Sequence, residues 1–259
     1  MFLDDINSFE EKSFKLKDKF LKKCDKCNSL RVIQRPDGNY EDCECAKFAK
    51  VKIRLICNGM PMGCVKLNWN NLKNYNKNNI KQIKDYSDDI EENIFNNTNL
   101  LINGQDKIEI IELESAMVND ICMLKNIEGN FYNILMITVN DLIQTSNAIR
   151  NNSELKYKFD KYLMNNGSCD ILILNYLGDE LDNRNNITAK LIEDMLVKRI
   201  LNNKITIIST TLQTEDIVNR YGNQFLVFLR RNFKNIKFVN DDYSSDFYNE
   251  SGDNSNGYY

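Results

Sequence analysis

The sequence predicts an α/β fold, in which a parallel sheet of five strands with flanking helices follows a small cysteine-bearing module. Five short apolar runs alternate with helical patterns from residue 99 onward, which is typical of parallel strands joined by helices. Four cysteines lie in two close pairs between residues 24 and 45. Residues 1–85 carry 18 Lys and Arg against 11 Asp and Glu, whereas residues 86–259 carry 16 against 26. This change in charge indicates two units with different partners.

The composition excludes several classes of enzyme. The 259 residues include no His, which excludes Ser-His-Asp and Cys-His nucleophilic sites, His-ligated zinc hydrolases and imidazole proton shuttles. With 10 Gly and 2 Pro, the chain has little material for glycine-rich phosphate loops or proline-rich linkers. No apolar run approaches the ~20 residues that a membrane span needs, so we expect a cytoplasmic protein without a membrane partner.

Residues 2–23 place apolar side chains among many charges, in a broken helical pattern. We expect one amphipathic helix or two short ones. Two roles stay open for its apolar face, which either covers the cysteine module or docks in a groove of a partner.

The four clustered cysteines, Cys24, Cys27, Cys43 and Cys45, form the pattern C-x2-C-x15-C-x-C. Each close pair supplies two thiolates from one turn, so a hairpin-like segment can wrap all four around Zn²⁺. The turn at residues 35–39 lies between an apolar run and the second pair, as such a hairpin requires. Because four thiolates leave no open position for water, we predict a structural zinc, with four reduced thiols as the alternative.

After the cysteines, a helix is predicted over residues 46–58, and Gly59–Gly63 ends it. Residues 68–99 are polar and weakly periodic, which indicates a linker with one helix. We therefore divide the chain into four parts: a zinc-binding, partner-docking module (1–66), a linker (67–98), an α/β domain (99–240) and a disordered acidic tail (241–259).

The α/β domain is predicted from its alternating patterns. Continuous apolar runs are expected for strands buried on both faces of a sheet. The candidate strands are residues 100–102, 133–137, 170–174, 205–209 and 236–239, and the helical patterns lie near 109–125, 141–163, 187–203 and 214–231.

Short segments also match a known family in order along the chain. They are Cys43-x-Cys45 followed by Gly59–Pro61, then Leu100–Gly104, Thr138-x-x-Asp141-Leu142, Asp170–Gly178, Thr206–Thr211 and Tyr221-Gly222. From about residue 20 to 240 the chain resembles the DnaC and DnaI helicase loaders and the related IstB transposition ATPases. The resemblance implies an AAA+ fold with the phosphate-loop strand central in the sheet. It also implies that Asp170–Gly178 holds the Walker B strand and Thr206–Thr211 the sensor strand.

The chemistry at the phosphate loop departs from what the resemblance implies. A phosphate loop uses glycine N–H groups, a Lys, and a Ser or Thr that holds Mg²⁺. Here Gly104 is followed by Gln105–Glu109, and the expected Lys-Thr pair falls on Ile110 and Ile111. Neither isoleucine binds phosphate or metal, although Lys107 offers a substitute contact to phosphate. We therefore expect a degenerate nucleotide site, with ATP not among the cofactors.

The other catalytic positions depart in the same direction. The acidic pair expected at the end of the Walker B strand falls on Asn175 and Tyr176, which removes a Mg²⁺ ligand and the general base. The sensor position falls on Thr211, and the arginine-finger position falls on Val227–Leu229, next to Arg230 and Arg231. We expect no hydrolysis and no catalytic residues.

Three functions follow, from different classes. The first is a non-hydrolysing adaptor, a pseudo-ATPase that, as the resemblance implies, binds a replicative hexameric helicase through its N-terminal module during replication initiation of a phage or plasmid. The second is a divergent active ATPase. The third is a zinc-containing regulator that binds single-stranded nucleic acid, including single-stranded DNA, through Lys and aromatic residues such as Tyr40, Trp69 and Tyr75.

Overall fold

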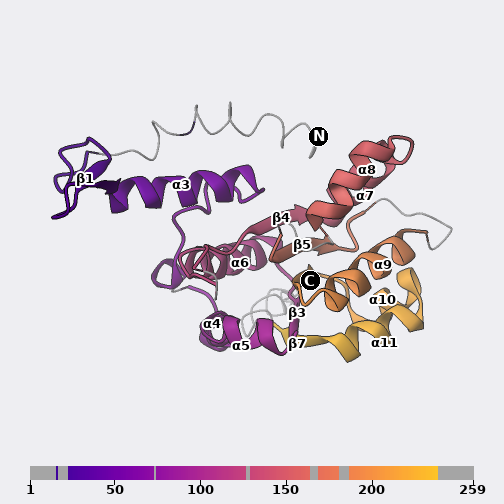
Figure 1. The fold of residues 1–259 in the computed structure, drawn as a ribbon. Coiled ribbons are helices and arrows are strands. Elements are labelled where there is room, and N and C mark those ends of the chain that lie inside the picture. Colours follow the sequence, from indigo (N-terminus) through magenta and orange to yellow (C-terminus); the bar gives the residue numbers. More distant parts are fainter. Residues whose placement is uncertain are drawn as a thin grey trace, which may run out of the picture.

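The computed structural model describes residue 16 and residues 23–72, 74–126, 129–163, 169–180 and 187–238. Within this part of the chain, a five-stranded sheet lies among helices, and a two-stranded hairpin lies at the far end of a long helix (Figure 1). The predicted α/β architecture with a separate N-terminal module is confirmed. Apart from Leu16, the predicted N-terminal helix lies outside the described residues, and so does the predicted tail at 241–259.

The sheet has the order β4-β5-β6-β3-β7, and its neighbouring strands are parallel. Its strands are β3 (Asn99–Asn103), β4 (Ile134–Thr138), β5 (Ile171–Leu177), β6 (Ile205–Thr210) and β7 (Phe233–Lys237). The strand expected to be central, β3, is an interior strand between β6 and β7, but the middle strand is β6. The last strand also begins earlier than the predicted residue 236.

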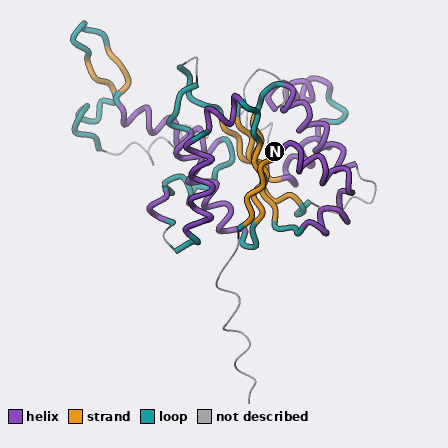
Figure 2. Tube along the Cα trace, turned by 90° about the horizontal axis from the view of Figure 1, so that it is seen from below, coloured by secondary structure: helices purple, strands orange, loops and turns teal. Residues whose placement is uncertain are grey.

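Both faces of the sheet are covered, because successive strand residues point to opposite sides. Leu100 and Ile102 belong to one hydrophobic cluster and Leu101 to the other. The first cluster contains residues of α3 (Glu44–Cys57), α4 (Lys77–Asp88), α5 (Ile90–Phe95) and α6 (Lys107–Ile121). The second contains residues of α7 (Val139–Ile149), α8 (Ser153–Leu163), α9 (Ile187–Leu201), α10 (Thr214–Tyr221) and α11 (Asn223–Asn232). Figure 2 shows the strands between these two layers.

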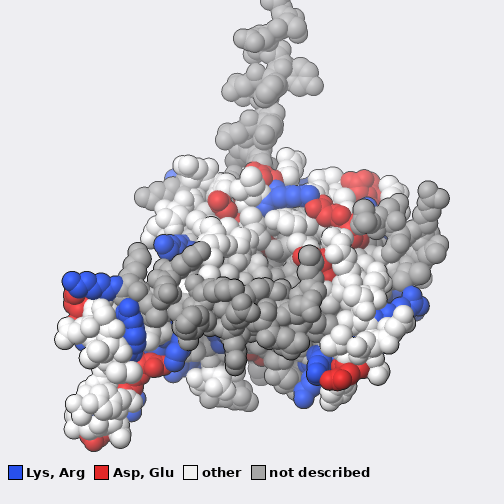
Figure 3. Space-filling model, turned by 90° about the horizontal axis from the view of Figure 1, so that it is seen from above, with Lys and Arg blue, Asp and Glu red and all other residues white. Residues whose placement is uncertain are grey.

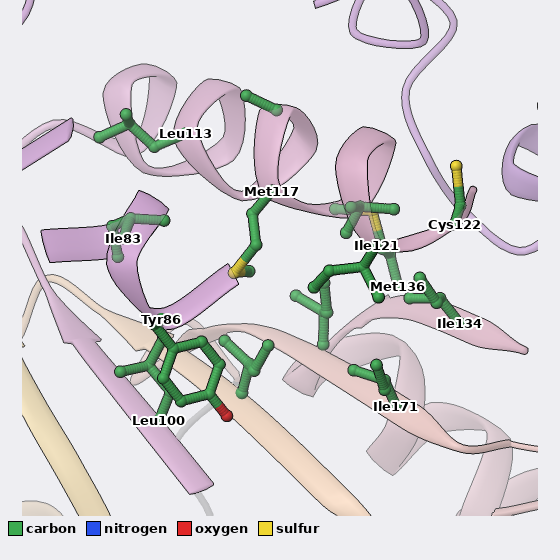
Figure 4. Packing of buried hydrophobic residues seen from close by; sticks show 14 of the residues in the cluster. Ile83, Tyr86, Leu100, Leu113, Met117, Ile121, Cys122, Ile134, Met136 and Ile171 are labelled. Carbon is green, nitrogen blue, oxygen red and sulfur yellow. The ribbon is translucent and has the colours of Figure 1, made fainter. Parts of the chain in front are cut away.

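The first cluster is built around α6. Met117 and Ile121 of this helix lie between Tyr86 of α4 and Met136 of β4 (Figure 4). All four side chains are at most 3% exposed. Burial of each such side chain contributes roughly 1.5–3 kcal/mol, so α6 is held firmly on the sheet.

The segment predicted as a linker holds more structure than expected. Residues 67–98 contain the short helix η1 (Trp69–Asn71) as well as α4 and α5, where one helix was predicted. Ile83, Tyr86 and Ile90 are fully buried in the same cluster as α6. This segment therefore packs as part of the α/β core, while the domain boundaries stay predictions.

Two predicted helices are divided in the structure. The pattern over 141–163 forms α7 and α8, because Asn152 accepts a hydrogen bond from the N–H of Leu155 (3.0 Å) and starts a new helix. The pattern over 214–231 forms α10 and α11, because Gly222 interrupts it with a φ of 87°. Among the described residues, none of the helices has the length and apolar content that crossing a membrane requires.

Candidate functional site

The four predicted zinc ligands come together beside the hairpin of β1 (Val32–Gln34) and β2 (Tyr40–Asp42). All four sulfur atoms lie within 4.8 Å of one another. The Sγ atoms of Cys24 and Cys43 are 4.0 Å apart, and those of Cys27 and Cys45 are 3.7 Å apart. Zn–S bonds of about 2.3 Å in a tetrahedron place sulfur atoms about 3.8 Å apart, so the cluster fits a structural zinc ion.

The first cysteine pair lies on a tight turn of the backbone. Asn28, Ser29 and Arg31 adopt left-handed conformations, with φ of 45°, 66° and 71°. The N–H of Ser29 donates to the carbonyl of Cys24 (2.9 Å) and closes this turn. Burial raises the pKa of the Cys27 thiol, but the backbone N–H of Arg31 and the neighbouring thiols outweigh it and lower this pKa to about 7. The thiolate form of Cys27 is therefore accessible near neutral pH, whereas burial raises the pKa of the neighbouring Cys45 thiol to about 11.

The N-terminal module carries ion pairs rather than a uniform positive face. Lys26 binds Glu44 (2.7 Å), Arg35 binds Glu41 (2.6 Å), and Lys50 binds Asp42 (2.5 Å). Figure 3 shows basic and acidic side chains next to one another on the lobe at the left, where the hairpin lies. The net positive charge predicted from the sequence is thus partly neutralised locally in this lobe.

The turn after β3 is packed by hydrophobic side chains. A Cβ at Gly104 would lie 2.9 Å from the ring of Phe238 and 3.0 Å from the side chain of Ile110, so glycine permits a close contact here. Ile110 is fully buried in the first hydrophobic cluster, and Ile111 is half-buried against it. Asp106 caps α6 by accepting a hydrogen bond from the N–H of Ile108 (2.7 Å), which places a carboxylate at the positive end of the helix.

Lys107, in the first turn of α6, is held by two residues from the end of β5 and the loop after it. Its ammonium group binds the carboxylate of Asp179, and it lies 5.5 Å from the centre of the Tyr176 ring. No local pattern predicts this contact, because Asp179 lies 72 residues from Lys107. The charge of Lys107 is therefore engaged within the chain.

The end of β5 has an unusual backbone conformation. Tyr176 adopts a left-handed φ of 62°, next to a register shift between Leu174 and Leu177. Its N–H donates to the hydroxyl of Ser209 (3.4 Å), and this hydroxyl donates to Oδ1 of the buried Asn175 (3.4 Å). Left-handed backbone at a residue other than glycine costs roughly 1–3 kcal/mol and is typical of functional sites.

Glu114 is a buried acid that the sequence reasoning missed. It lies in α6 with 0% exposure, and within the described part of the chain neither of its carboxyl oxygens has a hydrogen-bond partner. Burial raises its pKa to about 8, and the nearby hydroxyl of Ser209 offsets only part of that rise. Glu114 is one of two acids in the mostly apolar run Ile110–Val118, and the sequence offers no signal that separates it from Glu112.

The remaining predicted positions lie further along the chain. Thr211 follows the end of β6 and is half-buried. Arg230 and Arg231 are exposed in the last turn of α11. Two residues beyond Gly178, Glu180 is buried and accepts a hydrogen bond from Nε of Arg220 (3.1 Å), so the loop after β5 is tied to α10.

A cleft of about 510 Å³ opens beside Asn175 and Tyr176, at the carboxyl ends of β4 and β5. Asn175, Tyr176 and Ile111 line it, and Asp141 of α7 supplies a carboxylate. No Lys or Arg is among the described residues that line this cleft. Gly104 and Lys107, at the turn after β3, are not among the described residues that line it either.

The chain matches no family model and no curated protein, but it matches solved structures. The crystal structure of DnaI superposes with a TM-score of 0.54 at 13% identity, covering 70% of this chain and 95% of DnaI. The replication initiator DnaA, bound to AMPPCP and single-stranded DNA, superposes with a TM-score of 0.54 at 12% identity and covers 71% of this chain. The chain shares its fold with these two proteins. It spans about half (52%) of the DnaA chain. The DnaC helicase loader is 22% identical, with a TM-score of 0.49 over 61% of this chain and 86% of DnaC.

Within this fold, most of the predicted residues of the nucleotide site lie at one edge of the sheet. Gly104, Asn175 and Thr211 lie at or just beyond the carboxyl ends of β3, β5 and β6. Lys107 and Tyr176 are brought into contact, whereas Ile110 faces the hydrophobic core. The four clustered cysteines lie apart from this edge, at the amino end of α3 and in the turn that precedes the hairpin.

Proposed function

We propose that the chain is a non-hydrolysing adaptor of the helicase-loader type, which binds a replicative hexameric DNA helicase during replication initiation of a phage or plasmid. The observation that carries this proposal is the engagement of Lys107. The position of the expected phosphate-binding lysine falls on Ile110, and the ammonium of Lys107, which could substitute for it, binds Asp179 and lies over Tyr176. A triphosphate would have to displace both partners.

The neighbouring side chains support the same proposal. Ile110 is fully buried beneath Gly104, so it presents no donor to phosphate and no ligand to Mg²⁺. Asn175 and Tyr176 supply neither a Mg²⁺ carboxylate nor a general base at the end of β5. Each such contact contributes several kcal/mol to the transition state of phosphoryl transfer, so their combined loss would abolish hydrolysis.

The N-terminal module supports a docking role. The hairpin lies at the far end of α3, away from the sheet (Figure 1). Its large apolar side chains include Leu30, which is 73% exposed, and Tyr40, which is 69% exposed. Exposed apolar side chains on a rigid, metal-bound hairpin are suited to contact with another protein.

The test uses the purified full chain and its cognate hexameric helicase. We expect co-purification of the two proteins in the presence or absence of nucleotide, and no saturable binding of Mg-ATP by calorimetry. The double variant Leu30→Ser/Tyr40→Ser should weaken helicase binding at least tenfold. The matched control is Leu201→Ser, which changes a side chain that is 77% exposed on α9 and should leave binding unchanged.

Two outcomes would overturn the proposal in favour of the alternatives. Saturable ATP turnover that is removed by Lys107→Met would indicate a divergent ATPase. Tight binding of single-stranded DNA with a steep salt dependence, without helicase binding, would indicate a nucleic-acid-binding regulator. Two of the three aromatic residues considered for that role are half-buried and already engaged, since Trp69 donates to Asp120 and Tyr75 donates to Glu112.

A further inference from the structure

We propose that the cleft beside β4 binds an extended, basic segment of a partner protein, which adds to the sheet along the edge of this strand. Among the described strands, β4 lies at one edge of the sheet, with β5 as its neighbour. Figure 1 shows the end of α3 next to β4. The hairpin lies at the other end of α3, whose 14 residues span about 21 Å, so this surface is separate from the hairpin.

The chain itself covers only the first half of this edge. The carbonyl of Asn58, at the end of α3, accepts a hydrogen bond from the N–H of Met136 (2.8 Å). The side-chain amide of Asn58 donates to the carbonyl of Ile134 (2.9 Å). Asn58 thus takes the place of one residue of a neighbouring strand. The pairing stops there, because Gly59 turns the chain with a φ of 96° and Pro61 has no N–H to donate.

The second half of the edge borders the cleft. Residues 134–136 of β4 are buried, whereas Ile137 and Thr138 are half-buried and line the cleft. Backbone N–H groups of every second strand residue point to the same edge, so the N–H of Thr138 points to the side on which that of Met136 meets Asn58. A strand edge without a neighbour is a template for an added strand.

The charge in the cleft selects a basic segment. Among the described residues that line it, Asp141 is the one Asp or Glu, and none is Lys or Arg. Its carboxylate is exposed in the first turn of α7 and accepts a hydrogen bond from the hydroxyl of Thr138 (2.8 Å). A cationic side chain of the partner therefore meets a carboxylate that no cation of the lining opposes. The phosphates of a nucleic acid would find no counter-charge here.

The other lining groups suit the backbone and side chains of a peptide. Asn175 is 4% exposed, and its Oδ1 accepts a hydrogen bond from the hydroxyl of Ser209 (3.4 Å). Its amide nitrogen has no hydrogen-bond partner among the described residues, so it can donate to a peptide carbonyl. One face of α7 forms a wall of the cleft, with Asp141, Gln144, Thr145 and Ala148 at helical spacing. The volume of about 510 Å³ is within the range of about 300–1,000 Å³ typical of ligand sites.

Differential selection from a random heptapeptide phage library tests the proposal on the full chain. Peptides are retained if they bind the wild type but not Ala148→Trp, which fills the cleft from an exposed position. We expect the retained peptides to carry Arg or Lys next to Val, Ile or Thr. A synthetic copy should bind Ala148→Trp at least tenfold more weakly than wild type. The matched control is Asn147→Trp, on the adjacent exposed position outside the lining, which should bind within twofold of wild type.

Two further measurements on the synthetic peptide test the charge and the strand pairing. Asp141→Lys should weaken binding at least fivefold, whereas Asp216→Lys, in the first turn of α10, should leave it unchanged. Binding should slow hydrogen exchange of the Thr138 amide at least tenfold, because the added strand would accept its hydrogen bond.

Four outcomes would overturn the proposal. The first is a selection that yields no peptide distinguishing wild type from Ala148→Trp, and the second is retained peptides without basic residues. The third is a bound peptide that leaves the exchange of the Thr138 amide unchanged. The fourth is a different occupant, shown by an oligothymidylate that competes with the peptide or by self-association of the chain that Ala148→Trp removes.

Discussion

The ammonium group of Lys107 binds the carboxylate of Asp179 and thereby joins the start of α6 to the loop after β5. The same ammonium lies 5.5 Å from the centre of the Tyr176 ring. Lys107 is thus held by residues that β5 positions, across the edge of the sheet where β3, β5 and β6 end.

A double-mutant cycle with Lys107→Met and Asp179→Asn measures the strength of this contact. The two side chains are 48% and 37% exposed, so solvent screens the pair. We expect a coupling energy of about 0.2–1 kcal/mol from urea unfolding of the four proteins. A coupling above about 2 kcal/mol would contradict this expectation, because it would require a pair removed from water.

Removal of the metal should unfold the hairpin but leave the sheet folded. Among the described residues, β1 and β2 belong to neither hydrophobic cluster and are held by their own backbone pairing, the four cysteines and exposed ion pairs, whereas the sheet has its own hydrophobic clusters. We expect one zinc per chain by elemental analysis, and a chelator should expose the hairpin to protease while the unfolding transition of the sheet persists.

The matched variants for this experiment are Cys27→Ser and Cys57→Ser. Cys27 belongs to the four-cysteine cluster, and Cys57 lies at the other end of α3, outside it. Cys27→Ser should lower the zinc content well below one per chain, and Cys57→Ser should leave it unchanged. Equal zinc content in both variants would show that the cluster is not the metal site.

The sheet could be predicted because its strands are buried on both faces. Residues 205–210 are apolar or hydroxylated and all buried, so the sequence there is a continuous run bounded by polar turns. The helices α4 and α5 could not be predicted in the same way, because their buried residues are separated by Asn, Lys and Asp. Only packing against α6 distinguishes Ile83 and Tyr86 from the apolar residues of a solvated helix.

The candidate site was predictable where it depends on local spacing. The cysteines are close in the sequence, and their pattern alone predicts the cluster. The partners of Lys107 were not predictable, because the backbone reversal at Tyr176 and the position of Asp179 depend on tertiary contacts. Glu114 was missed because its environment is set by β6, which contributes Ser209 from 95 residues further along the chain.

Glu114 should make the stability of the fold depend on pH. Its pKa in the folded state is raised to about 8 from 4.5, so the folded protein binds this proton more tightly than the unfolded chain. The favourable contribution of the Glu114 carboxyl to the free energy of unfolding is complete below about pH 4.5. It is lost as the pH rises toward 8, by up to about 1.4 kcal/mol per pH unit. The free energy of unfolding of Glu114→Gln, relative to wild type, should therefore increase between pH 5 and pH 8.

Urea unfolding at pH 5, 6.5 and 8 measures this difference. The control is Glu154→Gln. Glu154 is an exposed acid, and its hydrogen bond with Lys158 lowers the pKa of its carboxyl group. The difference in the free energy of unfolding between Glu154→Gln and wild type should change little over the same pH range. If the free energies of unfolding of wild type and Glu114→Gln change with pH in parallel, the carboxyl of Glu114 does not titrate between pH 5 and pH 8.

Asn175→Asp should destabilise the fold less when the side chain at residue 114 carries no charge. The hydroxyl of Ser209 donates to Oδ1 of Asn175 (3.4 Å), and the same hydroxyl influences the pKa of Glu114. A carboxylate at residue 175 would place a second buried acid in this cluster, where like charges disfavour ionisation. At pH 8 we expect Asn175→Asp to lower the free energy of unfolding by about 2 kcal/mol or more. In the Glu114→Gln background, the same substitution should lower it by at least 1 kcal/mol less.

The control is Asp170→Asn, at the amino end of β5. Its effect on the free energy of unfolding should add to that of Glu114→Gln within about 0.5 kcal/mol. Additive effects of Asn175→Asp and Glu114→Gln would show that the two side chains do not share one buried polar cluster.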